Sequence, residues 1–582
     1  MLSRNLSELE RQANIARNKA LLEELELADA VNNVGFSKKP PPPPPRAKAK
    51  TKSVRPAKRE KRDIVEDPGP RRQSARLKRS ADDPNENPEK KRARLQGEEE
   101  QRRKAEDERL QAEEREREAR KPRHQDLELE TLLGIENIED KDEQKDLWRL
   151  KDTMVNVWPR PRPSGTYDSF TYEDTGEEER EVAELREKLT KLKIVARAKV
   201  TMNRVYCAQY HPEKSKDLIF FGDKRGQLGI WDPRTPADEV EDDGGADLEV
   251  QESGKYWRLQ VHWPATSRSS ISCIRFDPTN SHSIYTSSYD CTIRCLSMGS
   301  GISKEIFSSG DVLINSIDFD PAGHVIWISD AAGGITHFDI RMDQSKAIWY
   351  GLSGEKVGSV SVNPTRPHLL LTASNSRALR VWDTRKLSGL SGGSKPSSSG
   401  ILEYDNATVE DFCESTDGST LLRAEWTHKK SVSSAYWDPR GRSIVSTSYD
   451  DTIRLWDMNS SLLDSNSKFA SSRPFKQISH DCQTGKWLTI LKAQWTQNPD
   501  VYPHFTIGNM NHSLNIFSAK GDLLAKLSDS SKITAVQAVT CSHPSNVERV
   551  ASGNASGRCV LWAPPEDFEP QDKDAPEDEN TS

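Results

Sequence analysis

Downstream of about residue 200, apolar and polar residues alternate in short runs, which are separated by turns rich in Gly, Asn, Asp, Ser and Pro. One kind of run ends in a His-Pro, Asp-Pro or Asn-Pro turn, as in YCAQYHP, ISCIRFDP and VSSAYWDP. A second kind follows it, as in SIYTSSYD and SIVSTSYD. Alternation at every second position is the pattern of a half-buried β-strand. We therefore expect each unit to form a small antiparallel sheet.

A closing signature, such as LGIWD or LRVWD, ends each unit and occurs seven times. The seven copies align on Trp231, Leu296, Phe338, Trp382, Trp456, Phe517 and Trp562. Three intervals are 42, 44 and 45 residues long, close to the ~40–45-residue period of a WD-repeat blade. The longer intervals hold insertions at 236–254, 388–418 and 458–474. Because seven sheets can close into a ring that protects most strand edges, we predict an all-β, seven-bladed WD-repeat β-propeller over residues 191–565. Residues 191–200 would supply the outer strand of its last blade.

The rest of the chain has a different composition. Only 34% of all residues are hydrophobic and 30% are charged, whereas globular chains are ~45–50% apolar. We therefore expect a charged tail over residues 31–190 that is disordered or helical but solvated, and an acidic disordered tail over 566–582. Residues 6–28 carry apolar side chains at helical spacing, which predicts a short amphipathic helix within 1–30. This helix would either dock on a partner or be marginal by itself.

The formal net charge of -7 hides a strongly basic segment. Residues 46–79 hold fourteen Lys or Arg against four Asp or Glu, and Lys78-Arg79 are followed after a spacer by KKRAR at 90–94. Two basic clusters about ten residues apart resemble a bipartite nuclear import signal. The alternative is a generic basic arm that binds nucleic acid or nothing. We expect a nuclear protein with no membrane segment, since no apolar run approaches the ~18 residues of a span.

The loops of the predicted propeller suggest its chemistry. In such blades, the loop that leads into the first strand (the lead-in loop) and the turn between the second and third strands (the 2–3 turn) lie on one face. Basic residues occupy these loops in six of the seven units: Arg204, Lys224, Arg225, Arg268, Lys356, Arg377, Lys429, Lys430, Lys486, Lys532 and Arg558. Trp487 adjoins Lys486. Since phosphates pair with cations and bases stack on aromatic rings, this pattern predicts a face that binds DNA.

Two other interpretations of this face stay open. An acidic peptide or a histone-associated partner would also suit a basic surface, and exposed Lys and Arg are common on surfaces without a specific function. Four nearby aspartates, Asp290, Asp311, Asp450 and Asp451, would dilute the positive charge.

Several stretches resemble one known family. They are GDKRGQLGIWDPR (222–234), SIYTSSYDCTIR (283–294), PHFTIGNMNHSLNIFS (503–518), ASGNASGRCVLW (551–562), NIARNKALLEEL (14–25) and RRQSARLKR (71–79). The sequence is similar to the fungal WD-repeat damaged-DNA-binding, changed-mutation-rate protein family. The resemblance implies a nuclear protein that binds single- and double-stranded DNA, prefers ultraviolet-damaged DNA and acts in DNA metabolism and the damage response.

That family is in turn similar to the small subunit of the ultraviolet damage-binding complex, which inserts a Phe-Gln-His wedge, followed by Leu-Thr, into a lesion. The matching stretch is GKWLTILKAQW (485–495), where the wedge positions hold Gly485, Lys486 and Trp487. Trp487 would then stack on or between bases, or else pack on the neighbouring blade. The loss of Phe-Gln-His puts lesion-specific insertion in doubt, whereas phosphate contacts suffice for general DNA binding.

A second signal concerns protein partners. WDPR (231–234), FDIR (338–341) and WDTR (382–385) resemble the WDxR box that docks propellers on the adaptor of cullin-type ubiquitin ligases, through Arg234, Arg341 and Arg385 on the face opposite the lead-in loops. The alternative is that each arginine stabilises its own blade. The rival function is accordingly a ligase substrate receptor or a chromatin scaffold that contacts histones.

Catalysis and cofactors are not expected. The sequence has no G-x-x-x-x-G-K-[ST] or HExxH motif. Eight cysteines with no CxxC pair argue against a disulfide scaffold and a cysteine zinc site, and we expect no metal.

Overall fold

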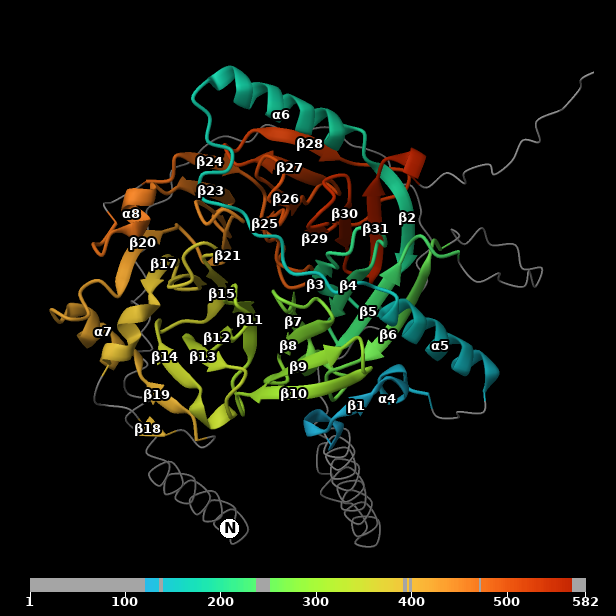
Figure 1. The fold of residues 1–582 in the computed structure, drawn as a ribbon, viewed down its shortest axis with the longest axis horizontal. Coiled ribbons are helices and arrows are strands. Elements are labelled where there is room, and N and C mark those ends of the chain that lie inside the picture. The colour runs from blue at the N-terminus through green and yellow to red at the C-terminus, as the bar shows by residue number, and fades with distance from the viewer. Residues whose placement is uncertain are drawn as a thin grey trace, which may run out of the picture. The chain divides into compact units, whose positions relative to one another are not determined.

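The computed structural model describes residues 121–135, 140–236, 252–390, 395–396, 400–469 and 473–567. The predicted amphipathic helix, the predicted nuclear import signal and all but the first two residues of the predicted acidic tail lie outside these residues. The described residues form seven antiparallel blades arranged in a ring, with helices α5 and α6 outside them (Figure 1). The predicted all-β, seven-bladed propeller is confirmed.

The blades follow one another along the chain, and each has its first strand innermost. Blade 1 has β3 (Val205–Tyr210), β4 (Ile219–Asp223), β5 (Gln227–Asp232) and β6 (Lys255–Gln260). Blade 2 has β7 (Ile271–Phe276), β8 (Ser283–Ser288), β9 (Thr292–Ser297) and β10 (Ile302–Ser308), and blade 3 has β11 (Ile314–Phe319), β12 (Val325–Asp330), β13 (Gly334–Asp339) and β14 (Ile348–Gly351). Blade 4 has β15 (Val357–Val362), β16 (Leu369–Ser374), β17 (Ala378–Asp383) and β20 (Leu422–Thr427).

Blades 5 to 7 complete the ring. Blade 5 has β21 (Val432–Trp437), β22 (Ser443–Ser448), β23 (Thr452–Asp457) and β24 (Lys476–Ser479). Blade 6 has β25 (Gln494–Trp495), β26 (His504–Gly508), β27 (Leu514–Ser518) and β28 (Leu523–Leu527). Blade 7 has β29 (Val539–Ser542), β30 (Val550–Gly553), β31 (Arg558–Ala563) and, as its outer strand, β2 (Lys193–Lys199). The prediction that 191–200 completes the last blade is therefore confirmed.

The predicted insertions add small elements to the ring. The second one contributes η5 (Thr384–Gly389), β18 (Lys395–Pro396), β19 (Leu402–Tyr404) and α7 (Asn406–Glu414), and the third contributes α8 (Ser460–Asp464). Strands β18 and β19 extend the outer edge of blade 3, where β19 pairs with β14 in parallel. Three short 3-10 turns are η3 (Ser267–Ser269), η4 (Gln344–Lys346) and η6 (Pro565–Asp567).

One left-handed residue in each 2–3 turn gives the seven blades the same turn geometry. The residues are Gly226, Cys291, Gly333, Arg377, Asp451, His512 and Gly557, with φ between 60° and 96°. At Gly557 the backbone also approaches closely, because an added Cβ would lie 2.0 Å from the Thr201 carbonyl oxygen. Glycine adopts this conformation freely, whereas an L side chain is strained by ~1–2 kcal/mol. The equivalent positions confirm the alignment of the seven units.

Residues 121–135 and 140–190 form an arm that packs on the propeller, which differs from the predicted disordered tail up to residue 190. The arm contains η2 (Lys121–His124), β1 (Leu127–Glu128), α4 (Leu129–Leu133), α5 (Lys141–Val155) and α6 (Thr175–Thr190). Leu150 and Met154 of α5 are buried in one cluster with Trp257 and Leu259 of β6. The charged composition hides these few apolar residues, because they form narrow stripes that bury against the ring rather than against each other.

Between α5 and α6 the chain crosses the middle of the ring (Figure 1). We call this segment, residues 156–174, the strap. The Arg162 N–H donates to the Pro278 carbonyl oxygen at 2.7 Å. The Tyr167 hydroxyl donates to the Met458 carbonyl oxygen, also at 2.7 Å. Because Pro278 follows a first strand and Met458 follows a third strand, the strap covers the face opposite the lead-in loops.

Buried histidines stabilise two blades. His262 lies 2.9 Å from Asp290 in blade 2, and His428 lies 3.1 Å from Asp450 in blade 5. Burial, with a smaller effect of the Arg454 charge, lowers the pKa of His428 from 6.5 to about 4. Burial alone lowers the pKa of His504, which is in β26, from 6.5 to about 4.

These lowered pKa values predict that acid destabilises the fold. Between pH 6.5 and 4, these histidines bind protons in the unfolded chain but stay neutral in the folded chain. Their contribution to the unfolding free energy is therefore fully present above about pH 6.5 and is lost as the pH falls toward 4. Each such histidine should cost about 2 kcal/mol at about pH 5, at ~1.4 kcal/mol per pH unit. Urea unfolding at about pH 7 and pH 5 should show His504→Gln losing about 2 kcal/mol less than the wild type between the two values.

The control for this measurement is His512→Gln, which changes an exposed histidine in the same blade. It should keep the wild-type difference in unfolding free energy between the two pH values. An equal pH dependence of His504→Gln and wild type would contradict the assignment.

Candidate nucleic-acid interface

The lead-in loops and the 2–3 turns lie on one face of the propeller, which we call the lead-in face. Within five blades, the N–H group of a 2–3 turn donates to a carbonyl oxygen of the lead-in loop. The pairs are Lys224 with Arg204 (2.9 Å), Tyr289 with Ser270 (3.0 Å), Ala331 with Leu313 (3.0 Å), Asn375 with Lys356 (2.9 Å) and Tyr449 with Ser431 (3.1 Å). The candidate DNA-binding residues from the two sets of loops therefore share a face.

The basic side chains of this face are accessible. Exposed residues are Arg225, Arg268, Arg377, Lys429, Lys430, Lys486 and Lys532, and half-buried ones are Arg204, Lys224, Lys356 and Arg558. Arg268 apart, none of them forms an ion pair with a carboxylate in the part of the chain that the structure describes. Their charge is therefore available to an external anion, which raises the local potential.

Most of the nearby aspartates are engaged within the protein. Asp290 bonds to His262, and Asp450 bonds to His428 and Arg454. Asp451 accepts from the Cys482 N–H at 3.1 Å and from the Gln483 side chain. Of the four that the sequence suggested would dilute the charge, Asp311 is the exposed one.

The structure brings several candidates together around the central channel. The Arg204 guanidinium donates to the Lys486 carbonyl oxygen at 3.2 Å and lies 5.9 Å from the centre of the Tyr206 ring. Tyr206 meets Tyr289 edge to face at 6.4 Å, and the Lys356 ammonium lies 5.6 Å from the Tyr289 ring centre. Cations and aromatic rings thus alternate across the channel mouth, a combination that suits bases and phosphates.

A second group lies at blade 7. Arg197, from the outer strand β2, donates to the carbonyl oxygen of Lys532. Burial and the nearby charge of Arg558 lower the pKa of Arg197. The other candidates are distributed around the ring: Arg268 lies in the lead-in loop of blade 2, Arg377 in the 2–3 turn of blade 4, and Lys429 and Lys430 in the lead-in loop of blade 5.

Trp487 projects from the long lead-in loop of blade 6. Its side chain is 78% exposed, the highest value among the large hydrophobic residues described. The loop itself is anchored, because Leu488 packs on the core and the Thr489 hydroxyl bonds to the Val205 carbonyl oxygen at 2.5 Å. The alternative in which Trp487 packs on the neighbouring blade does not match this exposure.

The three candidate adaptor-docking arginines lie on the opposite face and are held by their own blades. The Arg234 guanidinium lies 2.6 Å from Asp217, that of Arg341 2.6 Å from Asp339, and that of Arg385 2.6 Å from Asp383. Such pairs are what the stabilising alternative predicted. Docking on a ligase adaptor stays a prediction from the sequence.

Other residues at the site were not selected from the sequence. Arg197 belongs to an outer strand, and Tyr206 belongs to a first strand. Lys492, just before β25, lines the central channel and is not one of the candidate DNA-binding residues. The available signal was a lysine at a first-strand position where other blades place small or apolar residues, as in ILKAQW against VSSAYW. Within the described residues, no cluster of His, Cys, Asp and Glu could hold a metal, and no helix could cross a bilayer.

The comparisons with known proteins agree with the fold. Residues 257–296 and 419–457 match the family described as WD domain, G-beta repeat. Each segment runs from the outer strand of one blade to the third strand of the next, and these are the two segments that contain His262 with Asp290 and His428 with Asp450.

Curated relatives match nearly the whole chain. The DNA damage-binding protein CMR1 of Cryptococcus neoformans var. neoformans serotype D is 36% identical over 96% of this chain and 98% of its own length. The proteins of the same name from Phaeosphaeria nodorum and Mycosarcoma maydis are 32% and 30% identical, over 96% and 97% of this chain and 98% and 100% of their own lengths. The chain therefore belongs to the fungal family of DNA damage-binding proteins CMR1.

Proposed function

We propose that this protein is a nuclear, non-enzymatic DNA-binding protein that holds the phosphate backbone of single- or double-stranded DNA on its lead-in face. The observation that carries the proposal is the convergence of basic side chains from six blades on one face, with almost all of them lacking a carboxylate partner among the described residues. Phosphate contacts supply most of the affinity in such complexes, and they act on any sequence.

A preference for damaged DNA would need a further element that senses a weakened base stack. Trp487 suits this role, because it is exposed, aromatic and held by an anchored loop next to Lys486. Unstacking costs less at a lesion than in intact duplex, so an inserted ring would favour damaged sites. The names of the relatives, all damage-binding proteins, support this proposal.

The first prediction concerns salt. Lys429→Gln with Lys430→Gln should reduce the slope of log affinity against log salt by about 2, since each phosphate contact contributes about 0.9 for B-DNA. Fluorescence anisotropy of the full chain with one duplex, between about 50 and 200 mM NaCl, measures the slope. Lys214→Gln removes an exposed lysine from the loop between β3 and β4, on the opposite face, as a control and should keep the wild-type slope. An unchanged slope in the double variant would count against the lead-in face.

The second prediction concerns a variant that binds DNA more weakly but is no less stable. Arg377 occupies a left-handed position with φ of 67°, where three other blades place glycine. Arg377→Gly should relieve strain and leave the unfolding free energy unchanged or up to about 1 kcal/mol higher. The same variant should bind DNA more weakly, with a salt slope smaller by about 1. A variant that loses stability and affinity together would argue that Arg377 is merely structural.

The third prediction separates lesion sensing from charge. Trp487→Ala should weaken binding to single-stranded DNA by ~1–3 kcal/mol, the value of one base stacked on an aromatic ring. It should also lower the affinity ratio of ultraviolet-irradiated to intact duplex, while Trp487→Phe restores much of both. Competition binding with the two duplexes measures the ratio. If the ratio is wild-type in Trp487→Ala, the tryptophan is not the lesion sensor.

A further inference from the structure

The central channel of the propeller contains more positive than negative side chains. Two hollows of about 110 Å³ and 40 Å³ follow one another along it, and both have Arg275, Tyr436 and Gln494 in their walls. They are therefore successive levels of one channel. The strap borders the lower level through Arg160 and Arg162, and the lead-in loop of blade 6 borders the upper level through Ile490.

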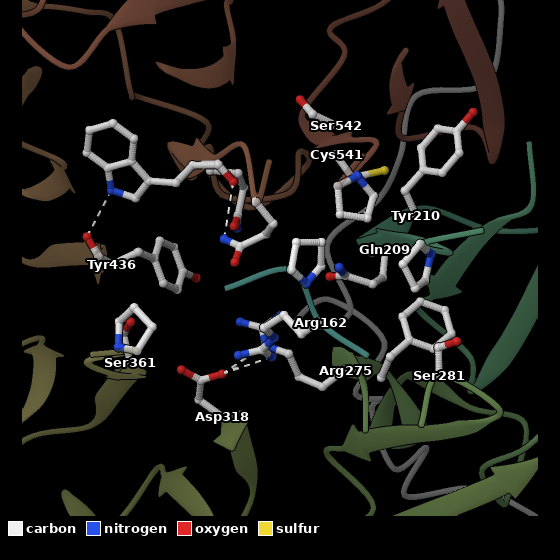
Figure 2. A pocket seen from close by; sticks show the side chains of 18 of the residues that line it. Arg162, Gln209, Tyr210, Arg275, Ser281, Asp318, Ser361, Tyr436, Cys541 and Ser542 are labelled. Atoms are coloured by element: carbon white, nitrogen blue, oxygen red, sulfur yellow. Dashed lines mark hydrogen bonds and ion pairs between the residues drawn. The ribbon is translucent and has the colours of Figure 1, made fainter. Parts of the chain in front are cut away.

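Two arginines meet at the lower level. Figure 2 shows Arg162 of the strap and Arg275 of β7 side by side, with Asp318 facing both. Asp318 lies 3.4 Å from Arg275 and 3.9 Å from Arg162, and its second oxygen accepts the Val362 N–H at 2.9 Å. Burial lowers the pKa of Arg162, and the charge of Arg275 adds to this effect. One carboxylate thus serves two guanidinium groups.

The upper level adds two lysines. Lys492 lines the hollow, and in the described part of the chain its ammonium has no ion pair and no hydrogen bond. Lys356 lies near the channel mouth above Tyr289. Burial and the charge of Lys492 lower the pKa of Lys356. Against these four cations, three carboxylates line the lower hollow, Asp277, Asp318 and Asp438, and Asp438 is paired with Arg440.

Polar side-chain groups without hydrogen-bond partners also indicate a ligand in the central channel. The Tyr436 side chain is 7% exposed, its hydroxyl has no hydrogen bond to any described residue, and Figure 2 shows it directed into the channel. Trp437 Nε1 and Ser542 Oγ, both in residues that line the lower hollow, are buried atoms without a hydrogen-bond partner in the described part of the chain. Buried donors without partners cost ~1–3 kcal/mol each, and a buried unpaired charge costs more.

We propose that the channel binds a phosphate-class oxyanion, held by Lys492, Arg275 and the Tyr436 hydroxyl. Water could satisfy the hydroxyl, but it would not neutralise the excess charge. A tetrahedral oxyanion does both, because it accepts several charge-assisted hydrogen bonds at once. A cavity needs only ~10–15 Å³ of accessible volume to hold one water. The two hollows, with about 110 Å³ and 40 Å³, therefore have room for a small anion with a few waters. The site does not depend on the proposed DNA binding, which uses other residues.

The test uses the full chain and inorganic phosphate, with ionic strength held constant by NaCl. Phosphate should raise the midpoint of thermal unfolding with a saturable dependence. Lys492→Met should weaken this dependence at least about tenfold, the effect of losing one charge-assisted hydrogen bond. Tyr436→Phe should weaken it less. Because the readout is the phosphate-dependent increment, a change in the baseline stability of a variant does not affect the result.

Two further arms make the outcome decisive. If dialysed protein already holds the anion, acid denaturation should release about one equivalent of inorganic phosphate from wild type and much less from Lys492→Met. Adenosine monophosphate in place of phosphate shows whether the site takes a free anion or a nucleotide's terminal phosphate. The proposal fails if wild type shows neither bound phosphate nor a phosphate-dependent increment, or if Lys492→Met keeps both. Lys430→Met should keep the phosphate effect while losing DNA affinity, and Lys492→Met should do the reverse.

Discussion

Closure of the ring by β2 fixes the direction from which the preceding segment of the chain approaches the propeller. Strand β2 pairs antiparallel with β31, from Lys193 opposite Ala563 to Lys199 opposite Arg558. Because Arg558 follows the 2–3 turn, β2 ends at the lead-in face and begins at the opposite one. The residues before it must therefore approach from the opposite face, as α6 and the strap do. This strand register thus places α6 and the strap at the opposite face, whereas Arg123, at the start of the described arm, donates to the Gly310 carbonyl oxygen in the lead-in loop of blade 3 at 3.4 Å.

The two faces use arginine in different ways. On the opposite face, Arg234, Arg341 and Arg385 form close pairs with aspartates of their own blades, and these pairs connect third strands to neighbouring turns. On the lead-in face, aspartates of the 2–3 turns bond to histidines, as in His262 with Asp290, so they leave nearby cations unneutralised. Arginine–aspartate pairs thus stabilise blades at the opposite face, whereas histidine–aspartate pairs stabilise blades at the lead-in face. The lead-in face, where the aspartates of the 2–3 turns are bonded within their own blades, is the one that keeps cations without carboxylate partners among the described residues.

The repeat pattern predicts the fold well because the propeller is periodic. Strand alternation, the closing signatures and the 2–3 turns recur, so one unit predicts the others, and even β2 follows from the need to complete blade 7. The arm does not recur. Leu150 and Met154 become a buried stripe only because β6 presents Trp257 and Leu259 to them, and no local pattern reveals that partner. The same distinction holds for the site residues. The cations of the loops could be assigned to one face from the strand topology alone. The neighbours of Arg204 and Lys492 could not, because they depend on the path of one long loop across the channel.

That loop, residues 480–493, also links the outer surface of the molecule to its centre. Its start is held by Asp451 through Cys482, its middle by Val205 through Thr489, and its end carries Lys492 into the channel. Trp487 lies between the first two attachments, five residues before the half-buried Lys492. An anion that neutralises Lys492 would lower the cost of burying the end of this loop, and so would restrict the movement of the segment that carries Trp487. If the proposed anion binds there, the charge in the channel would be linked to the orientation of the Trp487 ring through the backbone of residues 488–491.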